Sequence, residues 1–248
     1  MSSEIILLAV GAAVAGLIQG ISGFAFSMIA MSIWVWGIEP QVATIMAVFG
    51  GLTGQILTAF TVRRGMRLAV LLPFLLGALV GVPLGVMVLP YLNPATFKLT
   101  LGGMLVIFCP AMLMAQSIPK ITIGGRFADA IAGMIGGIMG GIGGFTGVIP
   151  SLWCTLRGFD KDLQRTIIQN FNLSALAVTM GAYLYTGAVT REMLPMFAVV
   201  APALLLPSLL GARIYTGLSD AAFRRIVLIL LTCSGLAMVA SALSGVLR

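Results

Sequence analysis

Residues 16–24 read Gly16-Leu-Ile-Gln-Gly-Ile-Ser-Gly-Phe24, and residues 137–145 read Gly137-Ile-Met-Gly-Gly-Ile-Gly-Gly-Phe145. The two stretches are 121 residues apart (137 − 16 = 121), and this shift superimposes three glycines and the phenylalanine. Glycines at this density inside an apolar run either interrupt a helix or let two helices approach closely. A glycine pattern that recurs at a fixed distance indicates an internal repeat.

The chain around these stretches is too apolar for a water-soluble domain. Of its 248 residues, 60% are hydrophobic and only 8% are charged, whereas soluble domains carry about 25% charged residues. Because so little polar surface cannot cover a core of this size, we expect the lipid bilayer to be the solvent. The sequence therefore predicts an all-α polytopic membrane protein.

Eight uncharged runs are long enough for membrane-crossing helices, which need about 20 apolar residues. Six of them are ordinary single spans: 40–62, 68–97, 99–119, 166–190, 193–212 and 226–247. The run 5–38 has 34 residues, which is too many for one crossing, and the run 130–156 has eight glycines within residues 133–147. Each of these two runs could form one tilted helix or a hairpin of two helical pieces.

The placement of Lys and Arg decides between these alternatives, because cytoplasmic loops carry an excess of both residues. If both runs are hairpins, eleven of the 14 basic residues lie on one side, against Lys98, Arg191 and Arg248 on the other. If each run crosses once, the split is six against eight, which is no bias. The sequence therefore predicts two hairpins in a multi-pass protein of the cell inner membrane, with both termini outside the cytoplasm. The first four residues contain Glu4 and no basic residue, so we expect no cleaved signal peptide.

The predicted organisation is two repeats, residues 1–124 and 125–248, in one membrane domain. Each repeat consists of a glycine-broken helical hairpin followed by three transmembrane helices. Such a unit crosses the membrane an odd number of times, so the second repeat is inverted relative to the first. Inverted repeats with discontinuous helices are typical of secondary transporters, whose substrates bind near the midplane where the breaks meet.

The titratable residues exclude several classes of function. The chain has no His, and its seven acidic residues lie at or just beyond the ends of the predicted spans. We therefore expect no catalytic residues, no metal and no cofactor, and neither a cation carrier nor a membrane enzyme fits well. A carrier of small anions fits best, while an anion channel on the same scaffold and a non-catalytic membrane subunit stay open. The net charge of +7 is explained by the cytoplasmic loops, so no nucleic acid is expected as a partner.

The candidate substrate-binding residues lie at the two breaks and in one polar helix. A helix that restarts after a break directs free N–H groups and the positive end of its dipole at a cavity, which suits an anion. Close helix packing would also explain the glycines, and hydrogen bonds between helices would also explain the buried amides. We select five residues of the first break, five of the second and two amides downstream, with Gln55 ranked lower: Gln19, Gly20, Ser22, Gly23 and Phe24; Gly140, Gly141, Gly143, Gly144 and Phe145; Asn170 and Asn172.

The stretch from Gly16 to Phe26, the glycine-rich stretch that ends at Gly147 and the two-part layout resemble the TauE/SafE family of bacterial inner-membrane permeases. The resemblance covers about residues 5–247. It implies export of small sulfur-containing anions such as sulfite, sulfoacetate or thiosulfate, with the anion and the lipid bilayer as partners; a homo-oligomer is compatible with the sequence. Gln19 corresponds to Gly140 and Ser22 to Gly143, so we expect an asymmetric site.

Overall fold

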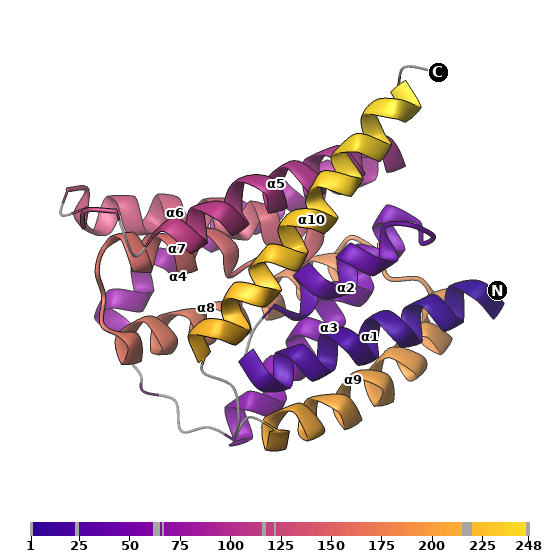
Figure 1. The fold of residues 1–248 in the computed structure, drawn as a ribbon, viewed down its shortest axis with the longest axis horizontal. Coiled ribbons are helices and arrows are strands. Elements are labelled where there is room, and N and C mark those ends of the chain that lie inside the picture. Colours follow the sequence, from indigo (N-terminus) through magenta and orange to yellow (C-terminus); the bar gives the residue numbers. More distant parts are fainter. Residues whose placement is uncertain are drawn as a thin grey trace.

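The computed structural model describes residues 2–22, 25–61, 65, 67–115, 118–121, 123–214 and 220–246, and within these ranges the chain forms helices and no strand. Two short 3-10 turns, η1 (Leu89–Tyr91) and η2 (Arg191–Met193), precede α5 and α9. The α-helices in the described ranges, shown in Figure 1, are α1 (Ser2–Ser22), α2 (Phe26–Trp34), α3 (Pro40–Thr61), α4 (Leu68–Val88), α5 (Pro94–Met114), α6 (Gly125–Gly143), α7 (Val148–Leu156), α8 (Lys161–Tyr185), α9 (Leu194–Ile214) and α10 (Asp220–Val246).

Six helical segments of the described chain are long and apolar enough to cross a membrane: Ser3–Ile21, Pro40–Phe60, Leu68–Tyr91, Pro94–Met114, Arg191–Gly211 and Arg225–Ser244. The predicted all-helical membrane architecture is confirmed at this level. The run 166–190, predicted as an ordinary span, forms most of α8 but is not among the six. The reason is composition, because α8 begins with charged residues and carries three amide side chains in its middle.

Two helices are too short to cross a membrane alone. Both α2 and α7 have nine residues, which at 1.5 Å per residue gives about 14 Å, roughly half of a bilayer core. Each follows a longer helix after a gap of a few residues, α2 after α1 and α7 after α6. In Figure 1, α1 and α2 lie next to each other and run in opposite directions.

The end of α6 shows why the chain turns where it does. Gly144 adopts a φ of +76°, in the left-handed region that a residue with a Cβ rarely occupies. Its N–H donates to Gly140 O (2.8 Å), and the N–H of Phe145 donates to Met139 O (3.3 Å). These two bonds satisfy carbonyls that the end of the helix would otherwise leave unpaired, and the bond from Gly144 to Gly140 is that of an αL C-cap. The glycine at position 144 therefore ends α6 before α7 begins.

Three helix pairs make the most extensive contacts: α4 with α6, α1 with α9, and α5 with α10. The α4–α6 pair approaches through glycine. A Cβ at Gly81 would overlap the backbone of α6 at Met134, and one at Gly133 would overlap the backbone of α4 at Phe74. The α1–α9 pair is similar, since a Cβ at Gly20 would overlap the carbonyl of Ser208. Small residues at these crossings allow direct contact between backbones.

The apolar core fixes the short helices against their neighbours. The ring of Trp34, at the end of α2, is completely buried, and its Nε1–H donates to Leu7 O of α1 (3.1 Å). A second, smaller cluster lies between α4 and α8, where the rings of Phe74 and Phe171 meet edge to face at 6.3 Å. The first contact therefore joins α2 to α1, and the second joins α4 to α8.

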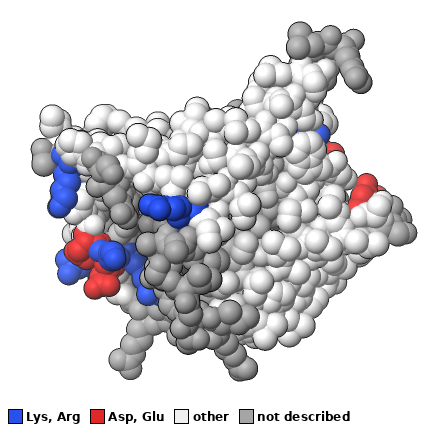
Figure 2. All heavy atoms as spheres, viewed as in Figure 1, with Lys and Arg blue, Asp and Glu red and all other residues white. Residues whose placement is uncertain are grey.

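The charged residues are not evenly distributed over the surface. In the view of Figure 2, most of the Lys and Arg side chains gather at one end of the molecule. The start of α1 and the end of α10 lie toward the opposite side in Figure 1. The middle of the visible surface carries almost no charge, as expected for a surface that faces lipid.

Candidate functional site

A cavity lies where residues 25–28 and 144–148 meet α3 and α8. Its volume, taken as the space open to the centre of a water molecule, is about 40 Å³. One buried water needs about 10–15 Å³ by this measure, so the cavity has room for a few waters or one small anion. None of the Lys, Arg, Asp or Glu residues that the structure describes lines it. Six polar side chains do: Gln19, Ser27, Gln55, Thr146, Ser151 and Asn172.

Gln19 is the most unusual of these side chains. It is only 3% exposed, and neither its Oε1 nor its Nε2 has a hydrogen-bond partner. An unsatisfied amide in the interior costs about 1–3 kcal/mol, so buried polar groups without partners are rare and need an explanation. The amide of Gln19 passes so close to Gly54 of α3 that a Cβ there would overlap it. A helix–helix contact at a glycine therefore leaves just enough space for this side chain to reach the cavity.

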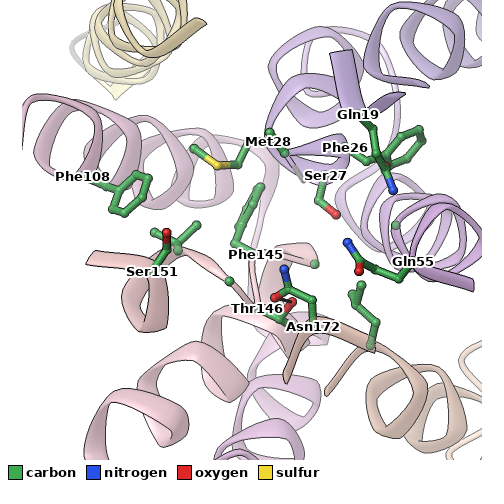
Figure 3. Close-up of a pocket in the computed structure, with 16 residues that line it drawn as sticks. Gln19, Phe26, Ser27, Met28, Gln55, Phe108, Phe145, Thr146, Ser151 and Asn172 are labelled. Atoms are coloured by element: carbon green, nitrogen blue, oxygen red, sulfur yellow. Dashed lines mark hydrogen bonds between the residues drawn. The ribbon is translucent and has the colours of Figure 1, made fainter. Parts of the chain in front are cut away.

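Asn172 presents its amide nitrogen to the same space. The hydroxyl of Thr146 donates to Asn172 Oδ1 (2.9 Å), and both residues are buried. This bond occupies the carbonyl side of the amide and orients the NH₂ group away from Thr146. In Figure 3 the nitrogens of Asn172 and Gln55 both point into the space between these residues and Ser27. Amides from α3 and α8 thus supply N–H donors from two sides.

The start of α2 supplies backbone donors. The first N–H groups of a helix have no partner within the helix, and in α2 these belong to Phe26, Ser27 and Met28, which all line the cavity. The first N–H that bonds within the helix is that of Ile29, to Ala25 O (3.1 Å). Ala25 has a φ of +79° and is the only non-glycine residue of the described chain with a positive φ. Such strain often marks a functional site.

The start of α7 is a poorer donor. Its third residue is Pro150, which has no N–H, and the N–H of Val148 already donates to Phe145 O (3.3 Å). The hydroxyl of Ser27 on the opposite side is also engaged, donating to Ala47 O (3.2 Å). The starts of α2 and α7 therefore contribute unequally, and the free backbone N–H groups lie mainly at the start of α2.

The apolar part of the cavity wall lies apart from the amides. Figure 3 shows Phe108 and Met28 on one side, Gln19 and Gln55 on the other, and Phe145 between them. Phe108 comes from α5, which contributes no other residue to the cavity lining among the described residues. The amides therefore lie on one side of the cavity, while the side of Phe108 also carries the hydroxyl of Ser151.

Four residues selected from the sequence lie in the cavity wall, namely Gln19, Gly144, Phe145 and Asn172. Gly23 and Phe24 lie outside the described residues, and of Ser22 only the backbone, at the end of α1, is described. The other five do not line the cavity: Gly20, Gly140, Gly141, Gly143 and Asn170.

Packing accounts for the glycines that do not line the cavity. Gly20 and Gly141 lie inside α1 and α6, where the backbones of α9 and α4 approach them directly. Gly140 and Gly143 leave space for the side chains of Thr146 and Phe145. Asn170 Nδ2 donates to Gly65 O (3.0 Å) and to Thr166 O (2.9 Å), so its amide is occupied away from the cavity.

Ser27, Thr146 and Ser151 line the cavity but were not selected from the sequence. Single hydroxyl side chains in apolar helices are common, and nothing in their spacing separates these three from the others. Their position relative to the repeat could have indicated two of them, because Ser27 lies three residues after Phe24 of the first glycine stretch and Thr146 lies within the second. Gln55, ranked lower, also reaches the wall and is 3% exposed.

One buried carboxylate lies away from the cavity. Asp129 was expected just beyond a span, but the structure places it one turn inside α6 and only 3% exposed. Trp153 Nε1–H donates to its Oδ1 (2.7 Å), and Arg157 Nε lies 3.9 Å from the same oxygen. The Arg157 guanidinium also lies over the rings of Trp153 and Phe159. These contacts stabilise the buried carboxylate and join α6 to α7.

No three His, Cys, Asp or Glu side chains of the described chain come together as a metal site.

The long apolar helices define a polytopic helical membrane protein, and an uncharged polar cavity lies between them. The chain belongs to the TauE/SafE family: the family described as sulfite exporter TauE/SafE matches residues 7–238, which is nearly the whole chain. Members of this family are membrane transporters of the sulfite or anion exporter type, not enzymes. The chain matches none of the curated proteins with which it was compared.

Proposed function

We propose that the chain is a secondary transporter that exports small sulfur-containing anions, organic or inorganic, across the bacterial inner membrane. The observation that carries this proposal is the cavity between the two helix breaks, where the amide of Gln19 is buried without a partner. A ligand that accepts hydrogen bonds would satisfy its NH₂ group. Anions are the ligands that helix starts and amide N–H groups bind best.

The cavity also supports the proposed organisation in two inverted repeats, residues 1–124 and 125–248. Five pairs of residues in its wall are 121 positions apart, the same shift that superimposes the glycine stretches: 25 and 146, 26 and 147, 27 and 148, 51 and 172, 55 and 176. If two repeats are related by a pseudo-twofold axis, a cavity on that axis is lined by equivalent residues of both repeats, as these pairs are. Its side chains differ within the pairs, since Gln55 corresponds to Leu176 and Asn172 to Gly51.

The contacts between helices show the same correspondence between the two proposed repeats. The first repeat would comprise α1 to α5 and the second α6 to α10, so that α4 corresponds to α9 and α6 to α1. Two of the three most extensive contacts, α4 with α6 and α9 with α1, are then equivalent, and the third joins the corresponding helices α5 and α10. This pattern supports alternating access by a movement of one repeat against the other around the cavity.

The proposed binding residues are those whose N–H groups face the cavity or shape its wall. Gln19 and Asn172 would donate from their amides, Gln55 would form part of the wall beside them, and the first turn of α2 would donate from its backbone. Gly144 would keep the second break close to Ser27, because a Cβ at that position would lie 2.9 Å from Ser27 Oγ.

Transport by the purified protein in proteoliposomes tests the proposal. The vesicles would be offered sulfite, sulfoacetate, thiosulfate, acetate and a cation, each with and without an imposed proton gradient. We expect saturable flux of the sulfur anions and accumulation against a gradient. Flux that rises linearly with concentration and never accumulates would favour a channel instead. An absence of anion flux in vesicles that hold folded protein would overturn the proposal.

A further inference from the structure

We infer that Ser151 binds a second polar group of the transported anion, on the side of the cavity away from Gln19, and thereby determines which organic anions the protein prefers. This inference rests on the proposed function, because it specifies the substrate class of the same cavity. The class is a small organic anion with a charged head, a short carbon link and a polar end group. An anion without an end group, such as sulfite, would bind without using Ser151.

The first observation is that the hydroxyl of Ser151 is buried without a partner. Ser151 lines the cavity and is only 7% exposed. A Ser or Thr inside a helix can donate its hydroxyl to the carbonyl four residues earlier, and Thr155 of the same helix does so, to Ser151 O (2.9 Å). Ser151 Oγ makes no hydrogen bond to any residue that the structure describes. A buried polar group of this kind needs an explanation, and a ligand in the cavity supplies one.

The backbone of Ser151 is fully engaged, so only the hydroxyl is available. The N–H of Ser151 donates to Gly147 O (3.0 Å), and its carbonyl accepts from Thr155 Oγ1 (2.9 Å) and from Gln164 Nε2 of α8 (3.2 Å). These contacts hold α7 against α8 at this residue. They therefore fix the position from which the hydroxyl reaches the cavity.

The hydroxyl lies apart from the donors proposed for the charged head. Figure 3 shows Ser151 beside Phe108, with Phe145 between this side of the cavity and Gln19. An anion whose head accepts from the amide of Gln19 can reach Ser151 only with atoms that follow the head. The two unpartnered side chains, Gln19 and Ser151, thus bind different parts of one ligand.

The space between these two side chains suits a short carbon link. Phe145 and Met28 line it and have no side-chain group that donates a strong hydrogen bond. The cavity of about 40 Å³ has room for roughly three or four waters, at about 10–15 Å³ for each. A ligand that spans it therefore has few atoms between its head and its end group.

The hydroxyl should discriminate by the polarity of the end group. A polar end group replaces the water that Ser151 loses when the ligand enters. An apolar end group of the same size leaves the hydroxyl without any partner, which costs more than the mere absence of a favourable contact. The predicted preference is therefore for the polar member of a pair of anions that have the same length.

Four anions separate the contribution of the head from that of the end group. Methanesulfonate has the charged head alone, hydroxyethanesulfonate and sulfoacetate carry a polar end group, and propanesulfonate has a methyl group in place of the hydroxyl of hydroxyethanesulfonate. The Kd of each follows from the rise in Tm of the detergent-purified protein with anion concentration. We expect hydroxyethanesulfonate to bind at least about threefold more tightly than propanesulfonate. Equal or tighter binding of propanesulfonate would overturn the inference.

Replacing Ser151 should abolish this preference. We expect Ser151→Ala to weaken the binding of hydroxyethanesulfonate and sulfoacetate at least about threefold and to leave that of methanesulfonate unchanged. Ser151→Cys, which keeps the size of the side chain but donates only weakly, should act in the same way. The matched control is Ser32→Ala in the other short helix, α2, because Ser32 donates to Ile29 O (2.7 Å) and does not line the cavity; it should keep the preference.

Two results with these variants would contradict the inference. One is an unchanged preference in Ser151→Ala and Ser151→Cys. The other is an equal loss for all four anions, since Ser151 would then shape the cavity without contacting the end group.

Transport separates failure of this inference from failure of the proposed function. If methanesulfonate enters proteoliposomes by saturable flux but the preference does not depend on Ser151, the inference fails and the proposed function stands. If the preference depends on Ser151 and no anion is transported, the binding role of Ser151 holds and the transport function fails. If no anion raises the Tm of the parent protein, both fail.

Discussion

At the scale of single residues, the buried amide of Gln19 opposes stability, and in the proposed function a bound anion would supply its missing hydrogen-bond partner. Its two polar atoms have no partner, and its neighbours Gly54 and Phe26 provide none. Replacing an unsatisfied buried polar group by an apolar one of similar shape is neutral or stabilising. Function and stability are therefore expected to respond in opposite directions at this position.

We predict that Gln19→Met leaves the free energy of unfolding unchanged or raises it by up to about 3 kcal/mol, while anion affinity falls at least about tenfold, or about 1.4 kcal/mol. Thermal unfolding with and without methanesulfonate measures both effects. The matched control is Gln164→Met, because Gln164 Nε2 donates to Ser151 O (3.2 Å) and Thr155 Oγ1. The control should lower Tm and keep the shift caused by the anion. A lower Tm for Gln19→Met together with undiminished anion binding would contradict the role given to Gln19.

At the scale of helices, direct contact between backbones joins the two halves of the molecule. In the α4–α6 pair, Gly81 meets the carbonyl of Met134, where no side chain fits. Added atoms in such a contact force the helices apart and cost about 1–3 kcal/mol. By contrast, a Cβ at Gly103 of α5 would meet nothing within 4 Å, and Ala in a helix is more stable than Gly by about 0.5–1 kcal/mol.

We therefore predict opposite effects for one substitution at two positions. Gly81→Ala should destabilise the protein by about 1–3 kcal/mol, while Gly103→Ala should be neutral or stabilising by up to about 1 kcal/mol. Thermal unfolding in one detergent compares the two directly. If both variants shift Tm by the same amount and in the same direction, the α4–α6 contact is not as close as the structure has it.

A polar contact centred on Asp129 joins α6 to the end of α7. Asp129 accepts a hydrogen bond from Trp153 and pairs with Arg157 at the end where α6 begins and α7 ends. Asp129→Ala leaves the indole N–H of Trp153 without a partner, and we expect a loss of about 1–3 kcal/mol in unfolding free energy. Asp129→Asn keeps an oxygen for Trp153, so thermal unfolding should show a smaller loss. Equal losses in the two variants would mean that the ion pair with Arg157, and not the hydrogen bond, holds the helices together.

At the scale of the whole molecule, composition alone was enough to predict a helical membrane protein, because the scarcity of charge leaves no other solvent for its surface. The site could be predicted only in part. Gln19 and Asn172 were found because an amide in an apolar run is costly without a role. Gly20 and Gly144 could not be distinguished, since one glycine at a helix crossing and another at a left-handed turn look alike in a sequence. The structure separates them, because only Gly144 has a positive φ and lines the cavity.

The orientation of the molecule in the membrane is the remaining prediction at this scale, and it follows from the gathering of basic residues at one end. We expect that end to face the cytoplasm and both termini to face away from it. Asp162 and Glu192 are both exposed; Asp162 lies among basic residues at the start of α8, and Glu192 lies in η2 after α8 has ended. In a chain with its three natural cysteines replaced by Ala, Glu192→Cys should react with a membrane-impermeant maleimide in intact cells whose outer barrier has been removed. Asp162→Cys should react only after the membrane is opened. The reverse labelling would place the basic end outside the cytoplasm and overturn the predicted orientation.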